Sequence, residues 1–239
     1  MTNTTNNTNK RDEFVRFSLV FRIQHIVLFL STITLIITGL PLKFHDTRWA
    51  EAFFRAVGGV EASGFIHRVG ASALIGFGVF HMLYIIFTSE GRGHFRELLP
   101  RVKDVTDVVK NVLHFFGFSK DGPKFGRFSY IEKFDYWAVY WGTVIMIGTG
   151  LMLWFKDFTM SKLPKIILDA ALEAHSDEAL LATLAIVVWH FYNVHFSPDH
   201  FPMNLTWWNG KLSAKKMKDH HPLEYEKLTA DTEAEEESS

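Results

Sequence analysis

The chain has 239 residues, of which 48% are hydrophobic and 15% aromatic, and its formal net charge is −1. This balance excludes a broadly basic nucleic-acid-binding protein, and no stripe of Arg and Lys with interleaved aromatic residues is present. Because the chain has no cysteine, it excludes disulfides, iron–sulfur clusters, thiolate metal sites and covalently attached c-type haem. Any redox centre in this chain must therefore use other ligands.

Four apolar runs are each long enough to cross the hydrocarbon core of a membrane, which takes about 20 helical residues. They cover residues 17–42, 65–88, 134–155 and 179–196, and none has an acidic residue in its interior. The first two runs also lack a polar face, which disfavours four buried helices of a water-soluble protein. The sequence therefore predicts an all-α integral membrane protein built as a four-helix bundle.

The distribution of Lys and Arg predicts how the spans are oriented. The N-terminal tail, the loop 89–133 and the C-terminal tail hold 17 of these residues, whereas the loops 43–61 and 156–174 together hold 6. Because loops rich in positive charge remain on the inner side of the membrane, both termini are expected in the cytoplasm.

The segment between the second and third spans predicts a further helix. After Pro100, six apolar residues follow at helical intervals: Val102, Val105, Val109, Val112, Leu113 and Phe116. This pattern is typical of an amphipathic helix in the membrane interface, here on the inner surface. The chain then divides into a disordered polar tail (1–13), a four-span domain (14–228) and an acidic tail (229–239) that is expected to be disordered.

Histidines inside the spans are the strongest functional signal, because ionisable groups are costly in a bilayer. His67 and His81 lie fourteen residues apart, and His175 and His190 lie fifteen apart. At about 100° per residue, each pair stays on roughly one helix face. Spans two and four run in the same direction. We therefore expect His67 to face His175 near the outer surface and His81 to face His190 near the inner one.

Two imidazoles at one depth match bis-histidine haem ligation, in which the iron takes one nitrogen on each side of its ring. The second span also contains small residues, which offer space for a macrocycle or serve close helix packing: Gly70, Ala71, Ala73, Gly76 and Gly78. His25 in the first span competes with His81 as the partner of His190. His195 is expected one and a half turns beyond His190, on another face. Two haems with a spare histidine and three haems both fit this sequence.

The sequence also resembles a known family, in the segments RIQHIVLFLSTITLIITG, FIHRVGASALIG, EKFDYWAVYWGTVIMIGTGLMLW, the span from His175 to His190, and KDHHPLEYE. They are similar to the membrane cytochrome b subunits of bacterial formate dehydrogenases and nickel–iron hydrogenases. The resemblance implies a di-haem b bundle that carries electrons between a quinone site near the inner haem and a partner at the outer face. It assigns His67 and His175 to the outer haem, and His25 and His190 to the inner one. His81 departs from that pattern, and its spacing is instead similar to the cytochrome b of respiratory bc complexes.

We therefore predict a b-type cytochrome of the bacterial or archaeal inner membrane with two or three b haems. It would relay electrons between quinone or menaquinone and a redox partner subunit, such as a multihaem cytochrome, a hydrogenase, a formate dehydrogenase or another molybdoenzyme. Because it has no cysteine for a cluster, we expect an electron-transfer subunit rather than a stand-alone enzyme.

Six residues close in depth to the inner histidines are candidates for quinone contacts: Arg22, Ser129, Glu132, Lys133, Asp135 and Asn193. Each of them is alternatively an interfacial group that anchors a span. Two other functions compete with the cytochrome interpretation. One is a transporter or metal-handling protein whose histidines bind ions, although such sites usually recruit Asp or Glu in mid-membrane. The other is an anchoring subunit whose histidines only pack.

Overall fold

The computed structural model describes residues 13–198 and 200–238. The chain forms two compact units. The helical unit comprises residues 20–96 and 134–204, and the terminal unit comprises residues 1–19, 97–133 and 205–239. All but one residue of the predicted N-terminal tail lies outside the described residues.

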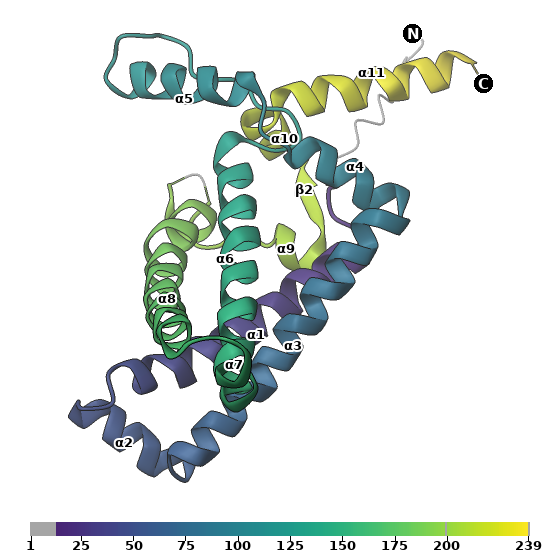
Figure 1. The fold of residues 1–239 in the computed structure, drawn as a ribbon. Coiled ribbons are helices and arrows are strands. Elements are labelled where there is room, and N and C mark those ends of the chain that lie inside the picture. Colours follow the sequence, from purple (N-terminus) through teal and green to yellow (C-terminus); the bar gives the residue numbers. More distant parts are fainter. Residues whose placement is uncertain (1–12, 199, 239) are drawn as a thin grey trace, which may run out of the picture. The chain divides into compact units, whose positions relative to one another are not determined.

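Four long apolar helices build the helical unit. They are α1 (Leu19–Lys43), α3 (Val60–Phe87), α6 (Tyr130–Trp154) and α8 (Lys165–Leu184), joined by the short helices α2 (Arg48–Val57) and α7 (Lys156–Lys162) and followed after α3 by α4 (Ser89–Leu98). Two π-helical segments, η1 (Ala185–His190) and η2 (Tyr192–Phe196), continue α8. All four helices are long and apolar enough to cross a membrane. The prediction of a mostly helical chain with four membrane spans is confirmed (Figure 1).

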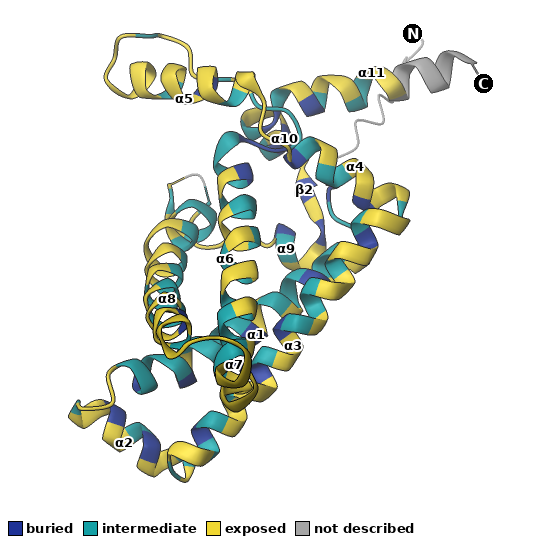
Figure 2. Cartoon of the chain, viewed as in Figure 1, coloured by how far each residue is buried: buried dark blue, intermediate teal, exposed yellow. Residues whose placement is uncertain are grey.

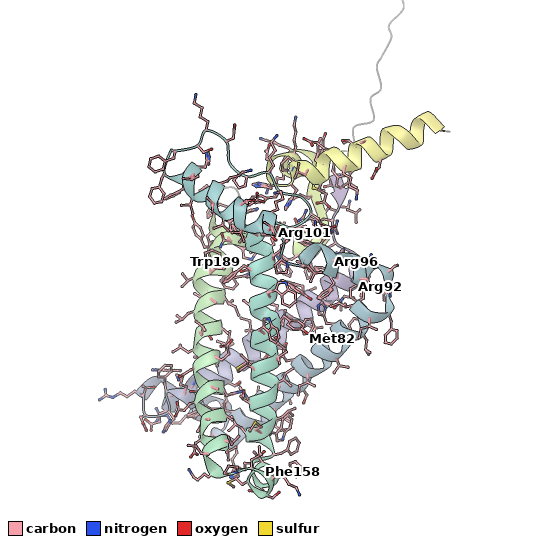
Figure 3. All side chains as sticks on the ribbon, turned by 45° about the horizontal axis from the view of Figure 1, so that its top comes forward. Met82, Arg92, Arg96, Arg101, Phe158 and Trp189 are labelled. Carbon is pink, nitrogen blue, oxygen red and sulfur yellow. The ribbon has the colours of Figure 1, made fainter. Side chains whose placement is uncertain are left out.

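The fourth span begins earlier than predicted. It runs from Lys165 to Phe196 instead of starting at residue 179. Pro164 precedes its first turn, where its fixed φ is compatible with a helix start. Lys165 then pairs with Asp169 one turn later (2.7 Å). His175 therefore lies well inside a continuous helix, and α6 and α8 run side by side in both Figure 1 and Figure 3.

Several buried positions of the spans carry small or polar residues, whereas many large apolar side chains are exposed. On α1 the buried residues include Gln24, Ser31 and Thr38, which follow one another at intervals of seven. The large apolar side chains of the spans mostly face outward (Figure 2). Small and polar residues inside with apolar residues outside are typical of helices that pack together in lipid.

Gly70 shows why the small residues of α3 are needed. A Cβ there would lie 3.1 Å from Thr34 Cγ2 on α1, whereas one at Gly76 would meet nothing within 4 Å. Gly70 therefore serves the close approach of α1 and α3.

A two-stranded antiparallel sheet anchors the terminal unit. Strand β1 (Glu13–Val15) pairs with β2 (Lys211–Ser213), with Phe14 opposite Leu212. Helix α9 (Thr206–Asn209) precedes β2, and α10 (Ala214–His220) and α11 (Pro222–Ser238) follow it. Phe14, Leu212 and Met217 form its buried cluster, against which Tyr225 packs. This sheet was not predicted from the sequence, because each strand has only three residues.

Helix α11 extends through most of the acidic segment that the sequence predicts to be disordered. Its last residue is Ser238. The segment is rich in Glu and contains Ala, which favour a helix locally. The domain boundaries at residues 13 and 229 remain a prediction.

Helix α5 (Val102–Phe115) occupies the segment predicted to be amphipathic. Its apolar residues are largely exposed, with Val102 83% and Val105 66% exposed. Most of the helix has the colour of exposed residues in Figure 2. Asp104 accepts a hydrogen bond from the Arg101 backbone N–H (2.6 Å) and thereby caps the helix. The terminal unit, to which α5 belongs, thus does not bury the apolar face of this helix.

Candidate functional site

The first pair of histidines lies between two spans of the helical unit. His67 on α3 and His175 on α8 have their ring centres 6.3 Å apart, with the ring planes inclined by 68°. A metal ion bound by one nitrogen of each ring would separate the ring centres by about 6 Å, given metal–nitrogen bonds of about 2 Å. The donor set therefore fits a single metal ion held between the two imidazoles, as in bis-histidine haem.

A threonine from a neighbouring helix holds each of these rings. His67 Nδ1 is hydrogen-bonded to Thr38 Oγ1 on α1, and His175 Nδ1 to Thr149 Oγ1 on α6, both at 2.9 Å. All four spans thus contribute to this pair, which we call the outer pair. With Nδ1 engaged in this way, Nε2 is the nitrogen that each ring could offer to a metal.

A second group of histidines gathers around the π-helical end of the fourth span. His190 Nδ1 is 3.1 Å from Asp135 Oδ2, while Trp189 Nε1 donates to Asp135 Oδ1 (2.8 Å). His25 on α1 interacts electrostatically with both His190 and His195. The structure therefore brings His25, His190 and His195 together, and we call them the inner group.

His81 is held differently. Its Nδ1 is hydrogen-bonded to Gln24 Oε1 (2.8 Å) and its Nε2 to the Tyr136 hydroxyl (3.1 Å). Both ring nitrogens thus have side-chain partners, from α1 and α6. An imidazole in this state has no lone pair left to offer iron without losing one of these bonds.

The winding of the fourth span differs from the sequence expectation around His195. The sequence predicts a regular α-helix, with His195 on another face than His190. The structure has π-helical turns over Ala185–His190 and Tyr192–Phe196. In a π-helix, the backbone hydrogen bonds join residue i to residue i+5. His195 therefore lies one turn further along the span than His190, on a similar side. Such local π-segments are frequent at functional sites.

Most candidate quinone residues have structural partners. Ser129 and Glu132 cap the start of α6: the Ser129 backbone N–H donates to Glu132 Oε2 (2.7 Å). Lys133 pairs with Asp104 (2.8 Å), and Asn193 donates to the Trp189 carbonyl (2.8 Å). Asp135 supports the inner group, as described above. Arg22 lies on α1, one turn before His25.

A buried ion network joins distant segments of the terminal unit. Arg16 pairs with Glu224 (2.8 Å) and with Glu132 (3.2 Å), and Arg127 pairs with the other oxygen of Glu224 (2.7 Å). His221 Nδ1 is hydrogen-bonded to the Gly126 carbonyl (2.8 Å). The late motif HHPLEYE therefore supplies two members of this network, His221 and Glu224.

We expect the terminal unit to become less stable as the pH falls below about 6.5. Burial, followed by the charge of Arg16, lowers the pKa of His221 from its ordinary value of 6.5. Unfolded chains then bind a proton more readily than the folded unit, so stability is full above that value and falls as the pH drops toward the lowered pKa. Hydrogen exchange of the terminal unit between pH 7.5 and 5 would measure this. His221→Asn, which keeps a donor to Gly126, should flatten the dependence, and His220→Asn is the control.

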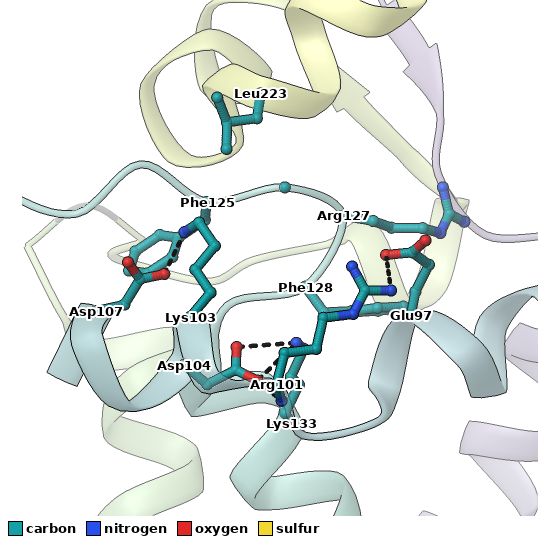
Figure 4. A pocket seen from close by; sticks show the side chains of 11 residues that line it. Glu97, Arg101, Lys103, Asp104, Asp107, Phe125, Arg127, Phe128, Lys133 and Leu223 are labelled. Carbon is teal, nitrogen blue, oxygen red and sulfur yellow. Dashed lines mark hydrogen bonds and ion pairs between the residues drawn. The ribbon is translucent and has the colours of Figure 1, made fainter.

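A pocket of the terminal unit lies beside this network (Figure 4). Its charged lining is already neutralised by ion pairs: Lys103 with Asp107, Lys133 with Asp104 and Arg101 with Glu97. The pocket is therefore a structural junction in which the chain satisfies its own charges.

Sequence reasoning missed the residues that hold the rings: Thr38, Thr149, Gln24 and Tyr136. One signal for two of them is present in the sequence. The tripeptide Thr-Gly-Leu occurs at Thr38 in the first span and again at Thr149 in the third. Its meaning depends on which helices are neighbours, which the sequence alone did not establish.

Comparison with known proteins identifies the family of this chain. The chain is 22% identical over 227 residues to the cytochrome b556(fdo) subunit of formate dehydrogenase from Escherichia coli (strain K12), which covers 94% of this chain and 97% of the relative. The same subunit from Escherichia coli O157:H7 matches to the same extent. Residues 16–199 match the family of prokaryotic cytochrome b561 proteins. The chain therefore belongs to the prokaryotic cytochrome b561 family of multi-pass membrane cytochromes, which carry b-type haem and transfer electrons.

Proposed function

We propose that this cytochrome relays electrons across the membrane through two b haems, one at the outer pair and one at the inner group. The observation that carries the proposal is the 6.3 Å separation of the His67 and His175 rings, which suits one metal ion between them. When bound, haem supplies the one-electron redox chemistry. The chain supplies axial imidazoles, an apolar surround and hydrogen bonds that orient the rings.

The inner haem is assigned to His25 and His190. Asp135 accepts from His190 Nδ1, which leaves Nε2 for iron. His25 lies near His190, whereas both nitrogens of His81 are hydrogen-bonded to other side chains. We therefore favour His25 over His81 and two haems over three. His195 becomes an auxiliary group beside the inner haem.

Replacing His25 and His81 in turn distinguishes these assignments. We expect His25→Ala to lose the inner haem, so that haem per chain falls by about half, because iron loses an axial ligand. His81→Ala should keep both haems and lose only its bonds to Gln24 and Tyr136. The pyridine haemochrome assay on purified protein measures both. Loss of a haem in His81→Ala with retention in His25→Ala would reverse the assignment.

The quinone site is proposed beside the inner group. Arg22, with several N–H donors, lies one turn from His25, and Asn193 lies between His190 and His195. Groups of this kind can hold the carbonyl oxygens of a quinone or menaquinone. Ser129, Glu132 and Lys133 remain weaker candidates, since contacts within the terminal unit already account for them.

The partner is proposed to be a redox enzyme subunit that docks near the outer pair. The relatives named above are subunits of formate dehydrogenase. This chain has no cysteine, so the partner must carry any iron–sulfur or thiolate centre. A formate dehydrogenase, another molybdoenzyme, a hydrogenase or a multihaem cytochrome would meet that need.

The orientation is proposed to place both termini in the cytoplasm of a bacterial or archaeal cell, because the loops assigned to that side hold most of the Lys and Arg residues. The exposed apolar face of α5 would then lie in the inner membrane interface.

A direct test is the metal and haem content of the purified protein. We expect about two b haems per chain, with b-type bands in reduced-minus-oxidised spectra. The competing metal-handling function needs several donors around one ion, and no group of three His, Asp or Glu side chains within the described residues has that arrangement. Stoichiometric zinc in a folded, haem-free protein would support that competitor and reject the cytochrome function.

A further inference from the structure

We infer that two Thr-Gly pairs, Thr38-Gly39 on α1 and Thr149-Gly150 on α6, are matching positioning elements for the outer haem. They would fix the proton of each outer histidine on Nδ1, present Nε2 to iron, and set the potential of this haem. The inference rests on the proposed function, because it requires that His67 and His175 bind haem.

The hydrogen-bonding capacity of the threonines determines which ring nitrogen carries the proton. Thr38 Oγ1 lies 2.7 Å from the Thr34 carbonyl, and Thr149 Oγ1 lies 2.7 Å from the Ile145 carbonyl. A hydroxyl has one hydrogen, and a carbonyl can only accept it. Each hydroxyl therefore donates to its own helix, as mid-helix threonines commonly do.

The histidine must then be the donor in its hydrogen bond with the threonine. Since its hydrogen is used, Thr38 Oγ1 can only accept from His67, and Thr149 Oγ1 can only accept from His175. In both rings Nδ1 carries the proton and Nε2 carries a lone pair. This is the tautomer that a metal requires at Nε2.

The glycines place the rings against the neighbouring helix. A Cβ at Gly39 would lie 3.3 Å from His67 Cε1, and a Cβ at Gly150 would lie 3.0 Å from His175 Cε1. Both contacts are closer than ordinary van der Waals distance, so a side chain would displace the ring. Within each pair, the threonine holds Nδ1 while the next residue leaves space for the adjacent ring carbon.

The two halves of the arrangement correspond residue by residue. Each pair lies on a helix that does not carry the histidine it holds, and each uses the same acceptor and the same clearance at Cε1. The inner group does this differently, because His190 uses the Asp135 carboxylate. The Thr-Gly arrangement is therefore particular to the outer pair.

Removing the hydroxyls should change the outer haem alone. Thr38→Val and Thr149→Val keep the side-chain shape but cannot accept from Nδ1. An unbonded Nδ1–H makes the imidazole a poorer donor, so the midpoint potential of the outer haem should shift to more positive values. Retention of this haem should also weaken by about tenfold or more. The double variant should shift further than either single one.

Three comparisons make the result specific. Thr38→Ser and Thr149→Ser keep the acceptor and should match the wild type. Thr34→Val and Thr183→Val remove hydroxyls that bond to Leu30 and Ala179 of their own helices, and should also match. The inner haem reports that each variant is folded. Redox titration of the absorption bands measures the potential, with the outer component identified as the one missing in His67→Ala.

Failure of the inference can be told from failure of the proposed function. If the valine variants keep an outer haem of unchanged potential, or the serine variants shift as far as the valine ones, the positioning role is wrong while the ligands stand. If His67→Ala keeps both haems, the ligand assignment itself is wrong.

Discussion

Replacing His175 with Ala is expected to remove the outer haem and leave the inner one in place. Haem per chain should fall by about half, because the proposed site holds iron through two axial imidazoles and only His67 would remain. Electron transfer from a reduced quinone analogue to an acceptor on the partner side should be lost. The pyridine haemochrome assay and the reduced-minus-oxidised spectrum measure the first effect, and stopped-flow reduction the second.

The same loss is expected for His67→Ala, since the two rings serve one site. His45→Ala is the matched control, because the His45 side chain is 67% exposed and lies between spans one and two. A variant of His175 that retains two haems would show that the outer iron takes another ligand. A variant in which both haems vanish while the helical content remains would show that the two sites assemble together.

The helical period and the predicted directions of the spans led to the expectation of the outer pair, because both histidines lie on long spans predicted to run in the same direction. Fourteen and fifteen residues return a side chain to nearly the same face of a regular helix. That argument holds as long as the helix stays regular, as α3 does between His67 and His81. The ring contact between His67 and His175 is the arrangement that this reasoning anticipates.

The same period fails for the second half of the fourth span. From Ala185 the span contains π-helical segments. The directions of side chains computed at 100° per residue therefore no longer apply to His190 and His195. The sequence also gave His81 a haem-facing position, whereas Gln24 and Tyr136 from two other helices engage both of its nitrogens. Which helices are neighbours, and how far each is rotated, depends on packing between segments distant in sequence.

Polar contacts across helices were the other feature beyond the sequence. Thr38 and Thr149 are ordinary span residues in composition, and their role follows only from the 2.9 Å contacts to the histidines. From the sequence, Asp135 is likewise interpreted as an interfacial charge. The structure shows that it is hydrogen-bonded to His190 and Trp189. Partners of metal-ligating histidines matter because they fix ring orientation and raise ligand basicity.

Breaking the ion network of the terminal unit is expected to have the largest effect on stability. Glu224 is 7% exposed and its two oxygens are shared between Arg16 and Arg127. Glu224→Ala would remove the carboxylate that pairs with the Arg127 guanidinium. It would leave Arg16, itself 4% exposed, with Glu132 as its remaining carboxylate partner. Removing one partner of a buried pair typically costs about 3–5 kcal/mol, because the remaining charge stays desolvated.

This loss of stability should appear as local unfolding of the terminal unit, while the membrane spans stay folded. The Leu223 N–H donates to the Phe125 carbonyl beside the network, so its hydrogen exchange should accelerate by about 100-fold or more. Glu226→Ala, an exposed position on the same helix, is the matched control and should leave exchange unchanged. Equal exchange in the Glu224 and Glu226 variants would mean that the sheet and the Phe14 cluster hold the unit without these charges. Because the proposed haem ligands belong to the helical unit, an unchanged haem spectrum in both variants would show that the spans remain folded.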